Sequence, residues 1–195
     1  EIYEMQVRAI ADASAKVYLE SGIWPRAQIM MPMVGFISEM VKLRKNVQAI
    51  LDERTVSDVP IGMMIELPRT CVVADEMTEA ADFFSFGTND LTQTTLGFSR
   101  DDAENAFMGK YTEEGILVSN PFETLDVSGV GKLINMAVES VESSGHHMSF
   151  GACGEHGGDP ASIEFFHAAG LDYVSCSPFR IPIARLAAAQ AALSV

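Results

Sequence analysis

Hydrophobic residues recur along the chain in two spacings, which together predict alternating helices and strands. Over Ile2–Leu19 they fall at helical spacing on an otherwise polar segment, which predicts an amphipathic helix. The next apolar run, Gln28–Val34, is short and closed by Gly35, as is typical of a strand. A Ser38 N-cap followed by apolar positions over Met40–Leu51 predicts a second helix.

The alternation continues to the end of the chain and predicts five strand–helix units. Four further apolar runs precede helical stretches: Gly62–Glu66, Phe83–Phe86, Met148–Cys153 and Tyr173–Cys176. The runs are apolar on both faces, as parallel strands covered by helices are, so the predicted class is α/β. Among the later helices, Val130–Val141 has the clearest apolar stripe, and Asp159 and Pro160 supply a cap and first residue for the next.

Two architectures fit this pattern, an open doubly wound sheet and a (β/α)₈ barrel of the TIM type. A complete barrel needs about 250 residues and eight units. In the barrel interpretation, residues 1–195 are a single domain truncated at its N-terminus, with only the C-terminal five or so units present. The connection Phe98–Asp126 is unusually long and acidic. It predicts either a cover over a site or a tolerated surface insertion.

Composition and charge narrow the function classes. A hydrophobic content of 48% is enough for a sizeable core. The net charge of −14 disfavours binding to nucleic acids or anionic lipids. Neither a membrane-spanning run nor a signal-peptide layout is expected, which argues against secretion. An anionic substrate would therefore need local positive charge, such as a bound cation.

Cysteine usage favours a reducing compartment. Cys71, Cys153 and Cys176 are odd in number and show no CxxC spacing, which argues against a disulfide framework and a zinc site. We interpret Cys71 and Cys176 as buried structural residues. Cys153 instead ends a strand before a glycine-rich turn, where nearby amides and His156 are expected to ease thiolate formation. An inert buried thiol is the alternative for Cys153.

Polar residues follow the predicted strands at the edge where parallel α/β folds bind ligands. Glu66 and Asp90 lie one strand–helix repeat apart and are expected to project toward a shared point. Two carboxylates that leave other positions to water and substrate suit Mg²⁺. The alternative is that both acids cap helices or pair with Arg69 and Arg100. Between them, the sequence Gly-Thr-Asn before Asp90 adds a hydroxyl and an amide that can contact an anion.

Longer stretches resemble a known family. Asp82–Gln93 resembles the signature of the phosphoenolpyruvate-utilising enzymes. Within that group, Cys153–Ser162 and Gly170–Arg185 are similar to the pyruvate phosphate dikinase family in particular. Its members interconvert ATP, phosphate and pyruvate with AMP, diphosphate and phosphoenolpyruvate, through a phosphohistidine on a swivelling domain. The resemblance implies that this chain belongs to the barrel that binds phosphoenolpyruvate and pyruvate.

The resemblance also implies roles for individual residues. Cys153 matches the catalytic residue that exchanges a proton with the substrate's methylene carbon. Glu66 and Asp90 match the Mg²⁺ ligands. The matching substrate-binding residues are Glu66, Gly87, Thr88, Asn89 and Asp90.

Other parts of the family's machinery have no match in this chain. The phosphate-gripping arginines, the phosphohistidine and the nucleotide site are absent from the matched segments, and none of the four histidines is assigned as phosphoryl carrier. The isolated chain is therefore expected to show no dikinase turnover. Unpaired strands at the barrel edges favour a homodimer or aggregation. The implied location is the cytoplasm or a metabolic organelle such as a plastid or glycosome.

Three other functions remain open at the level of sequence. The first is a sibling activity, phosphoenolpyruvate synthase or enzyme I of the sugar phosphotransferase system. The second is a metal-dependent lyase that acts through a pyruvate enolate. The third is a purely structural, dimer-forming half-barrel.

Overall fold

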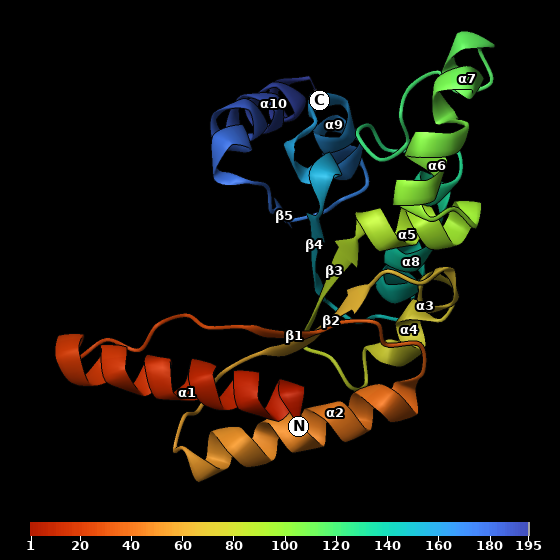
Figure 1. Ribbon diagram of the computed structural model, residues 1–195. Helices are drawn as coiled ribbons and strands as arrows, with labels where there is room; N and C mark the ends of the chain where they lie inside the picture. The colour runs from red at the N-terminus through yellow and green to blue at the C-terminus, as the bar shows by residue number, and fades with distance from the viewer. Residues whose placement is uncertain (195) are drawn as a thin grey trace.

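The computed structural model describes residues 1–194 and contains one parallel sheet, whose strands run in sequence order from β1 to β5 (Figure 1). The strands are β1 (Ile29–Met31), β2 (Ile61–Ile65), β3 (Phe83–Gly87), β4 (Ser149–Cys153) and β5 (Tyr173–Val174). Every neighbouring pair is parallel. The order lacks the reversal that a doubly wound sheet requires, so the five strands form part of a TIM-type barrel. The predicted α/β class and barrel architecture are confirmed.

Helices connect and cover the strands. They are α1 (Ile2–Ser21), α2 (Ile37–Glu53), α3 (Pro68–Val72), α4 (Ala74–Met77), α5 (Thr88–Leu96), α6 (Arg100–Ala106), α7 (Met108–Glu113), α8 (Val130–Ser143), α9 (Pro160–Ala168) and α10 (Ile181–Leu193), with short 3₁₀ turns η1 (Glu155–Gly158) and η2 (Pro178–Arg180). The long helices α1 and α2 lie side by side (Figure 1). Within residues 1–194, none of these helices has the length and apolarity needed to cross a membrane.

The core lies between the sheet and the helices that cover it. Strand β3 is buried along its whole length, and its rings Phe84 and Phe86 pack on Phe150 of β4 with centroids 6.0 and 6.3 Å apart. Burial on both faces explains why the strands lack the alternating pattern of a half-exposed sheet.

The start of α2 differs from the prediction. Ser38 lies inside the first turn, and the N-cap is Phe36. Glu39 supplies the acceptor instead, because its Oε2 accepts the N–H groups of Gly35 and Phe36 at 2.8 and 2.9 Å. The predicted Asp159 cap of α9 is confirmed, since its carboxylate accepts the Ser162 N–H at 2.9 Å.

The long connection 98–126 is a small folded insert that contains α6 and α7. Ala103, Met108 and Phe122 form its own buried cluster, and the Arg100 guanidinium lies over the Phe122 ring at 5.6 Å. The insert continues past α5, at the end of the sheet toward which β3 points (Figure 1). It therefore lies at the edge where ligands bind in this class of fold.

Candidate functional site

The carboxyl ends of β2, β3 and β4 bring the predicted site residues together. Glu66 directly follows β2, and Asp90 lies in the first turn of α5, just after β3. Cys153 ends β4 opposite Gly87 in the strand register. Asp90 raises the pKa of Glu66, and Glu66 and Asp90 both raise the pKa of Cys153, because the three side chains lie close together. The predicted convergence of the three strand ends is therefore present.

Glu66 is a buried carboxylate, only 3% exposed. Its Oε1 accepts the Met33 N–H at 2.6 Å. Burial raises the pKa of Glu66, the Met33 hydrogen bond lowers it, and the charge and hydrogen bond of Asp90 raise it further. The two carboxyl groups thus lie within hydrogen-bonding reach and repel each other when both are ionised.

The alternative role for these acids as ion-pair partners is wrong. Arg69 donates to the carbonyl of Gly35, and Arg100 pairs with Glu104 at 3.3 Å. Among the ion pairs within residues 1–194, none includes Glu66 or Asp90.

The glycine at the end of β3 leaves room for the Glu66 carboxylate. A Cβ on Gly87 would lie 2.6 Å from Oε2 of Glu66 and 2.6 Å from the sulfur of Met64. Any side chain at this position would displace the Glu66 carboxylate. The local sequence therefore leaves the space above β3 to Glu66 and to whatever it binds.

Thr88 and Asn89 join the end of β3 to the turn after β4. The Thr88 hydroxyl lies 2.7 Å from the carbonyl oxygen of Cys153, to which it can donate. The Glu155 N–H donates to Oδ1 of Asn89 at 3.2 Å. Gly154 has φ of 102°, and a Cβ there would lie 2.8 Å from Asn89 Oδ1 and 2.9 Å from Thr88 Oγ1. These contacts fix the two strand ends relative to each other.

The Cys153 thiol is half-buried and lies 3.6 Å from the carbonyl oxygen of Phe86. Burial raises its pKa, a hydrogen bond with Ser85 lowers it, and the charges of Glu66 and Asp90 raise it. The expectation that amides and His156 ease thiolate formation is therefore wrong. The neighbouring carboxylates oppose a second negative charge, so the protonated thiol is the favoured form at neutral pH.

Ser85 and Tyr173 are site residues that the sequence pattern did not indicate. Ser85 lies close enough to the Cys153 thiol and to the Tyr173 hydroxyl to lower the pKa of each. Tyr173 of β5 reaches over Gly151, its register partner in β4, where any Cβ would collide with the ring. Ser85 is the single hydroxyl-bearing residue in an otherwise apolar strand, and this polar residue at a buried position could have indicated its role.

The donor set fits a magnesium ion. Within residues 1–194, no group of three or more His, Cys, Asp or Glu side chains could enclose a metal. The protein instead offers two hard carboxylate oxygens from adjoining strand ends. Mg²⁺ is typically held by one or two carboxylates, with waters and substrate oxygens in the remaining positions. Glu66 and Asp90 are the residues that would hold it.

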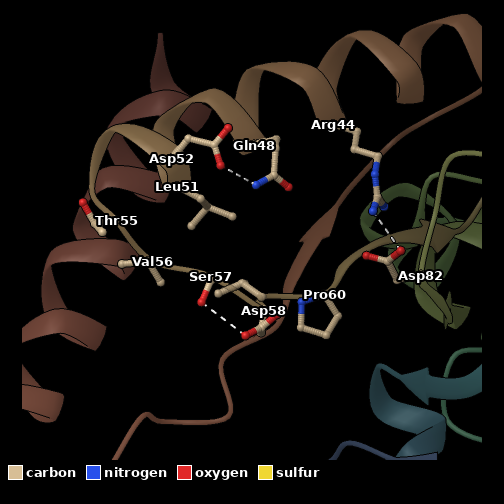
Figure 2. A pocket seen from close by; sticks show the side chains of 11 residues that line it. Arg44, Gln48, Leu51, Asp52, Thr55, Val56, Ser57, Asp58, Pro60 and Asp82 are labelled. Atoms are coloured by element: carbon tan, nitrogen blue, oxygen red, sulfur yellow. Dashed lines mark hydrogen bonds and ion pairs between the residues drawn. The ribbon is translucent and has the colours of Figure 1, made fainter.

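A hollow of about 870 Å³ lies at the opposite edge of the sheet (Figure 2). It is bounded by the end of α2, the loop 55–60 and Asp82, which precede β2 and β3. Its one arginine, Arg44, pairs with Asp82 at 2.9 Å and also donates to two backbone carbonyls. Ligands of parallel α/β folds bind at the carboxyl ends of strands. This hollow is therefore not the candidate site.

Comparison with known proteins gives the same family as the sequence motifs. Residues 1–193 match the family described as "PEP-utilising enzyme, PEP-binding domain". The chain is 51% identical to pyruvate, phosphate dikinase from Rhizobium meliloti over 100% of its own length and 22% of the relative's. The dikinase from Clostridium symbiosum is 52% identical over 100% of this chain and 23% of the relative.

A plant protein is also similar in sequence, and one solved structure is similar in fold. Pyruvate, phosphate dikinase 1, chloroplastic, from Arabidopsis thaliana is 51% identical over 97% of this chain and 20% of the relative. A crystal structure of a citrate lyase from Burkholderia xenovorans superposes with a TM-score of 0.61 at 14% identity, over 95% of this chain and 53% of that one. The latter likeness shows the fold alone.

The sequence matches thus extend over the whole chain but only part of each relative. The chain spans about a fifth of the length of the curated dikinases it matches. The match to the family covers all the strands and all the strand-end residues described above. The chain belongs to the PEP-utilising enzymes and corresponds to their PEP-binding domain.

Proposed function

We propose that this chain is the phosphoenolpyruvate- and pyruvate-binding part of a pyruvate, phosphate dikinase. The observation that carries the proposal is the meeting of two carboxyl groups and a thiol at three adjoining strand ends. The identity of about half the residues to named dikinases over the full chain supports the same assignment. The sequences after Cys153 and around Arg180 favour a dikinase over the sibling synthase and enzyme I.

Glu66 and Asp90 are proposed to hold Mg²⁺. When bound, the cation supplies positive charge that offsets the charge on the substrate's oxygens. The chain's own contribution is to hold two carboxyl groups close together at adjoining strand ends. The Met33 N–H fixes one Glu66 oxygen, and Gly87 leaves room for the other.

Substrate contacts are proposed for the turn after β3. Asn89 accepts the Glu155 N–H through Oδ1, so its amide NH₂ is the group it can present to an anion. The N-terminal end of α5 begins at Thr88 and adds partial positive charge at the same place. These residues would orient a small carboxylate between the metal ligands and the thiol.

Cys153 is proposed to transfer the proton. In the direction from phosphoenolpyruvate to pyruvate, the S–H bond breaks and its proton forms the new C–H bond at the methylene carbon of the enolate. In the reverse direction, the thiolate removes a methyl proton. The carbonyl oxygen of Phe86 lies 3.6 Å from the sulfur, and Ser85 and Tyr173 are its neighbours. A thiol with a raised pKa is a suitable acid for this step at neutral pH.

The rest of the activity is proposed to come from outside residues 1–195. Both edge strands, β1 and β5, have one free side, which further strands of a longer protein would pair with to close the barrel. A swivelling domain would carry the phosphohistidine, and a homodimer is the proposed assembly. We propose the cytoplasm or an organelle as its location, since one relative is named as chloroplastic.

The proposal is tested by exchange of the pyruvate methyl protons with deuterated water, catalysed by a protein of the relatives' full length. We expect exchange that needs Mg²⁺ and falls at least about 100-fold in Cys153→Ala, the usual scale for loss of a general acid. Wild-type exchange in Cys153→Ala would refute the role of the thiol. Diphosphate dependence of turnover separates a dikinase from the synthase, and phosphohistidine labelling separates both from a lyase.

A further inference from the structure

His156 is a buried histidine that the proposed reaction does not use. It is fully buried, and both ring nitrogens have partners. Nδ1 lies 2.8 Å from the Thr88 hydroxyl, and Nε2 lies 2.9 Å from the carbonyl oxygen of Pro121. The ring therefore lies between the substrate turn after β3 and the folded insert 98–126.

The partners fix the proton on Nε2. A carbonyl oxygen can only accept, so Nε2 carries the proton that bonds Pro121. In the neutral ring Nδ1 is then an acceptor that faces the Thr88 hydroxyl, whose oxygen also lies 2.7 Å from the carbonyl oxygen of Cys153. Burial lowers the pKa of His156, which favours this neutral form.

Two groups at the end of β4 and in the turn after it thus contact the Thr88 hydroxyl. One is the carbonyl of Cys153, and the other is the ring of His156, three residues later. The other ring nitrogen holds the insert, so one side chain joins three segments that are far apart in sequence. The insert has a second tie to the body, where the Leu125 N–H donates to Ser162 Oγ at 3.0 Å.

We propose that His156 is a positioning residue, which through Thr88 holds the Cys153 turn in place and through Pro121 couples that turn to the insert 98–126. The role rests on the proposed function, because it concerns the placement of that reaction's thiol and substrate turn. This role differs from simple packing because each ring nitrogen contacts a different segment: Nδ1 contacts Thr88, and Nε2 bonds Pro121.

Two substitutions separate the two tasks. Asn can reproduce the position of Nδ1 and keep a contact with Thr88, whereas Gln can reproduce Nε2 and keep the bond to Pro121. The first readout is the rate at which iodoacetamide alkylates Cys153, followed by mass spectrometry with Cys176 as the internal reference. The second is amide hydrogen exchange over the insert 98–126.

In the 195-residue chain we expect a crossed result, in which each variant changes one readout and leaves the other unchanged. His156→Gln should accelerate alkylation of Cys153 about five-fold, the scale of one lost hydrogen bond, and leave exchange in the insert unchanged. His156→Asn should leave alkylation within about two-fold and accelerate exchange in the insert about five-fold. Equal effects of both variants on both readouts would assign the ring to packing and overturn the proposal.

Thr88 provides a second test, from the other side of the same contact. Thr88→Val should accelerate alkylation at least as much as His156→Gln, and Thr88→Ser, which keeps the hydroxyl, should restore the slow rate. Adding His156→Gln to Thr88→Val should have no further effect, because both act through one contact. Additive effects, or an unchanged rate in Thr88→Val, would refute the link.

Neither readout needs pyruvate or a metal. A crossed result without methyl exchange in the longer protein would reject the proposed function and keep the positioning role. Metal-dependent exchange of the methyl protons without a crossed result would keep the proposed function and reject the positioning role.

Discussion

A carboxylate buried beside another carboxylate weakens the fold that contains it. The folded-state pKa of Glu66 is raised above its ordinary value of 4.5. The folded protein therefore binds this proton more tightly than the unfolded chain does. Without metal, stability should fall as pH rises from about 4.5 through the raised pKa, because deprotonation favours the unfolded state.

Glu66→Gln should accordingly stabilise the metal-free chain at pH 7, by about 1 to 2 kcal/mol. The amide keeps the oxygen that accepts the Met33 N–H and can donate to Asp90. Urea unfolding at pH 5 and pH 7 measures the change. Mg²⁺ should reverse the order, because a ligand that binds only the folded wild type stabilises it. A variant less stable than wild type without Mg²⁺ would contradict this account of Glu66.

Gly154 and Gly97 occupy positions that favour glycine, but Gly154, with ψ of −173° against 28° at Gly97, has the more restrictive backbone and is also the more crowded. Both have positive φ, 102° and 68°. A Cβ on Gly154 would meet Asn89 and Thr88, whereas one on Gly97 would meet nothing within 4 Å. Gly97→Ala should cost about 1 kcal/mol from backbone strain alone.

Gly154→Ala should cost at least about 3 kcal/mol, because the strain is joined by displacement of the two polar side chains. Thermal unfolding of the two variants compares the costs directly. Equal losses of stability would mean that the turn after β4 does not depend on close contact with the end of β3.

Residue chemistry explains which site residues the sequence could predict. Glu66, Asp90 and Cys153 stand directly at or after strand ends, so the strand pattern alone places them at one edge. Ser85 and Tyr173 could not be assigned in the same way, because their relevance depends on side chains meeting across β3, β4 and β5. The state of the thiol was mispredicted, since the sequence does not reveal that two carboxylates surround it.

At the scale of elements, α9 depends on its cap. The Asp159 carboxylate accepts both the N–H and the hydroxyl of Ser162, at 2.9 and 2.6 Å. The Ser162 oxygen in turn accepts the Leu125 N–H from the insert. The cap therefore orients the serine that ties the insert to the body of the domain.

Asp159→Ala should destabilise the chain by about 1 kcal/mol, the usual cost of a lost N-cap. It should also increase amide exchange near Leu125, and Asp159→Asn should retain most of the stability because it remains a good cap. Urea unfolding and hydrogen exchange provide the two readouts. A destabilised chain with unchanged amide exchange at Leu125 would mean that the cap does not help to hold the insert.

The positions of elements were more predictable than their ends. All five strands were predicted from short apolar runs, yet β1 pairs only over Ile29–Met31, because the backbone turns at Met33 with φ of 54°. The cap of α2 was misassigned because serine and glutamate both suit a first turn, and only the fold selects between them. The helices α6 and α7 were missed because their small core is formed by residues of the insert itself.

At the scale of the whole molecule, the sheet has two free edges and several exposed apolar side chains. Strands β1 and β5 each have one paired side. Phe179, Leu186 and Leu193 near the C-terminus are 93, 62 and 86% exposed. Such surfaces favour association with other chains.

The isolated chain should therefore self-associate with rising concentration. Sedimentation velocity over a hundred-fold range of concentration would detect it, with dikinase turnover absent throughout. A monomer at all concentrations, or robust turnover from this chain alone, would contradict the proposal that a longer protein completes the barrel.

The central claim is that Glu66 and Asp90 share one divalent cation beside Cys153. Its most direct test is a Mn²⁺ titration of the isotopically labelled chain by NMR, because bound Mn²⁺ broadens nearby resonances. We predict that the amides of residues 66–67, 88–91 and 153–155 broaden first, and that Glu66→Gln abolishes this effect. First broadening around Asp52, Asp58 and Asp82, at the opposite edge of the sheet (Figure 2), would contradict the account.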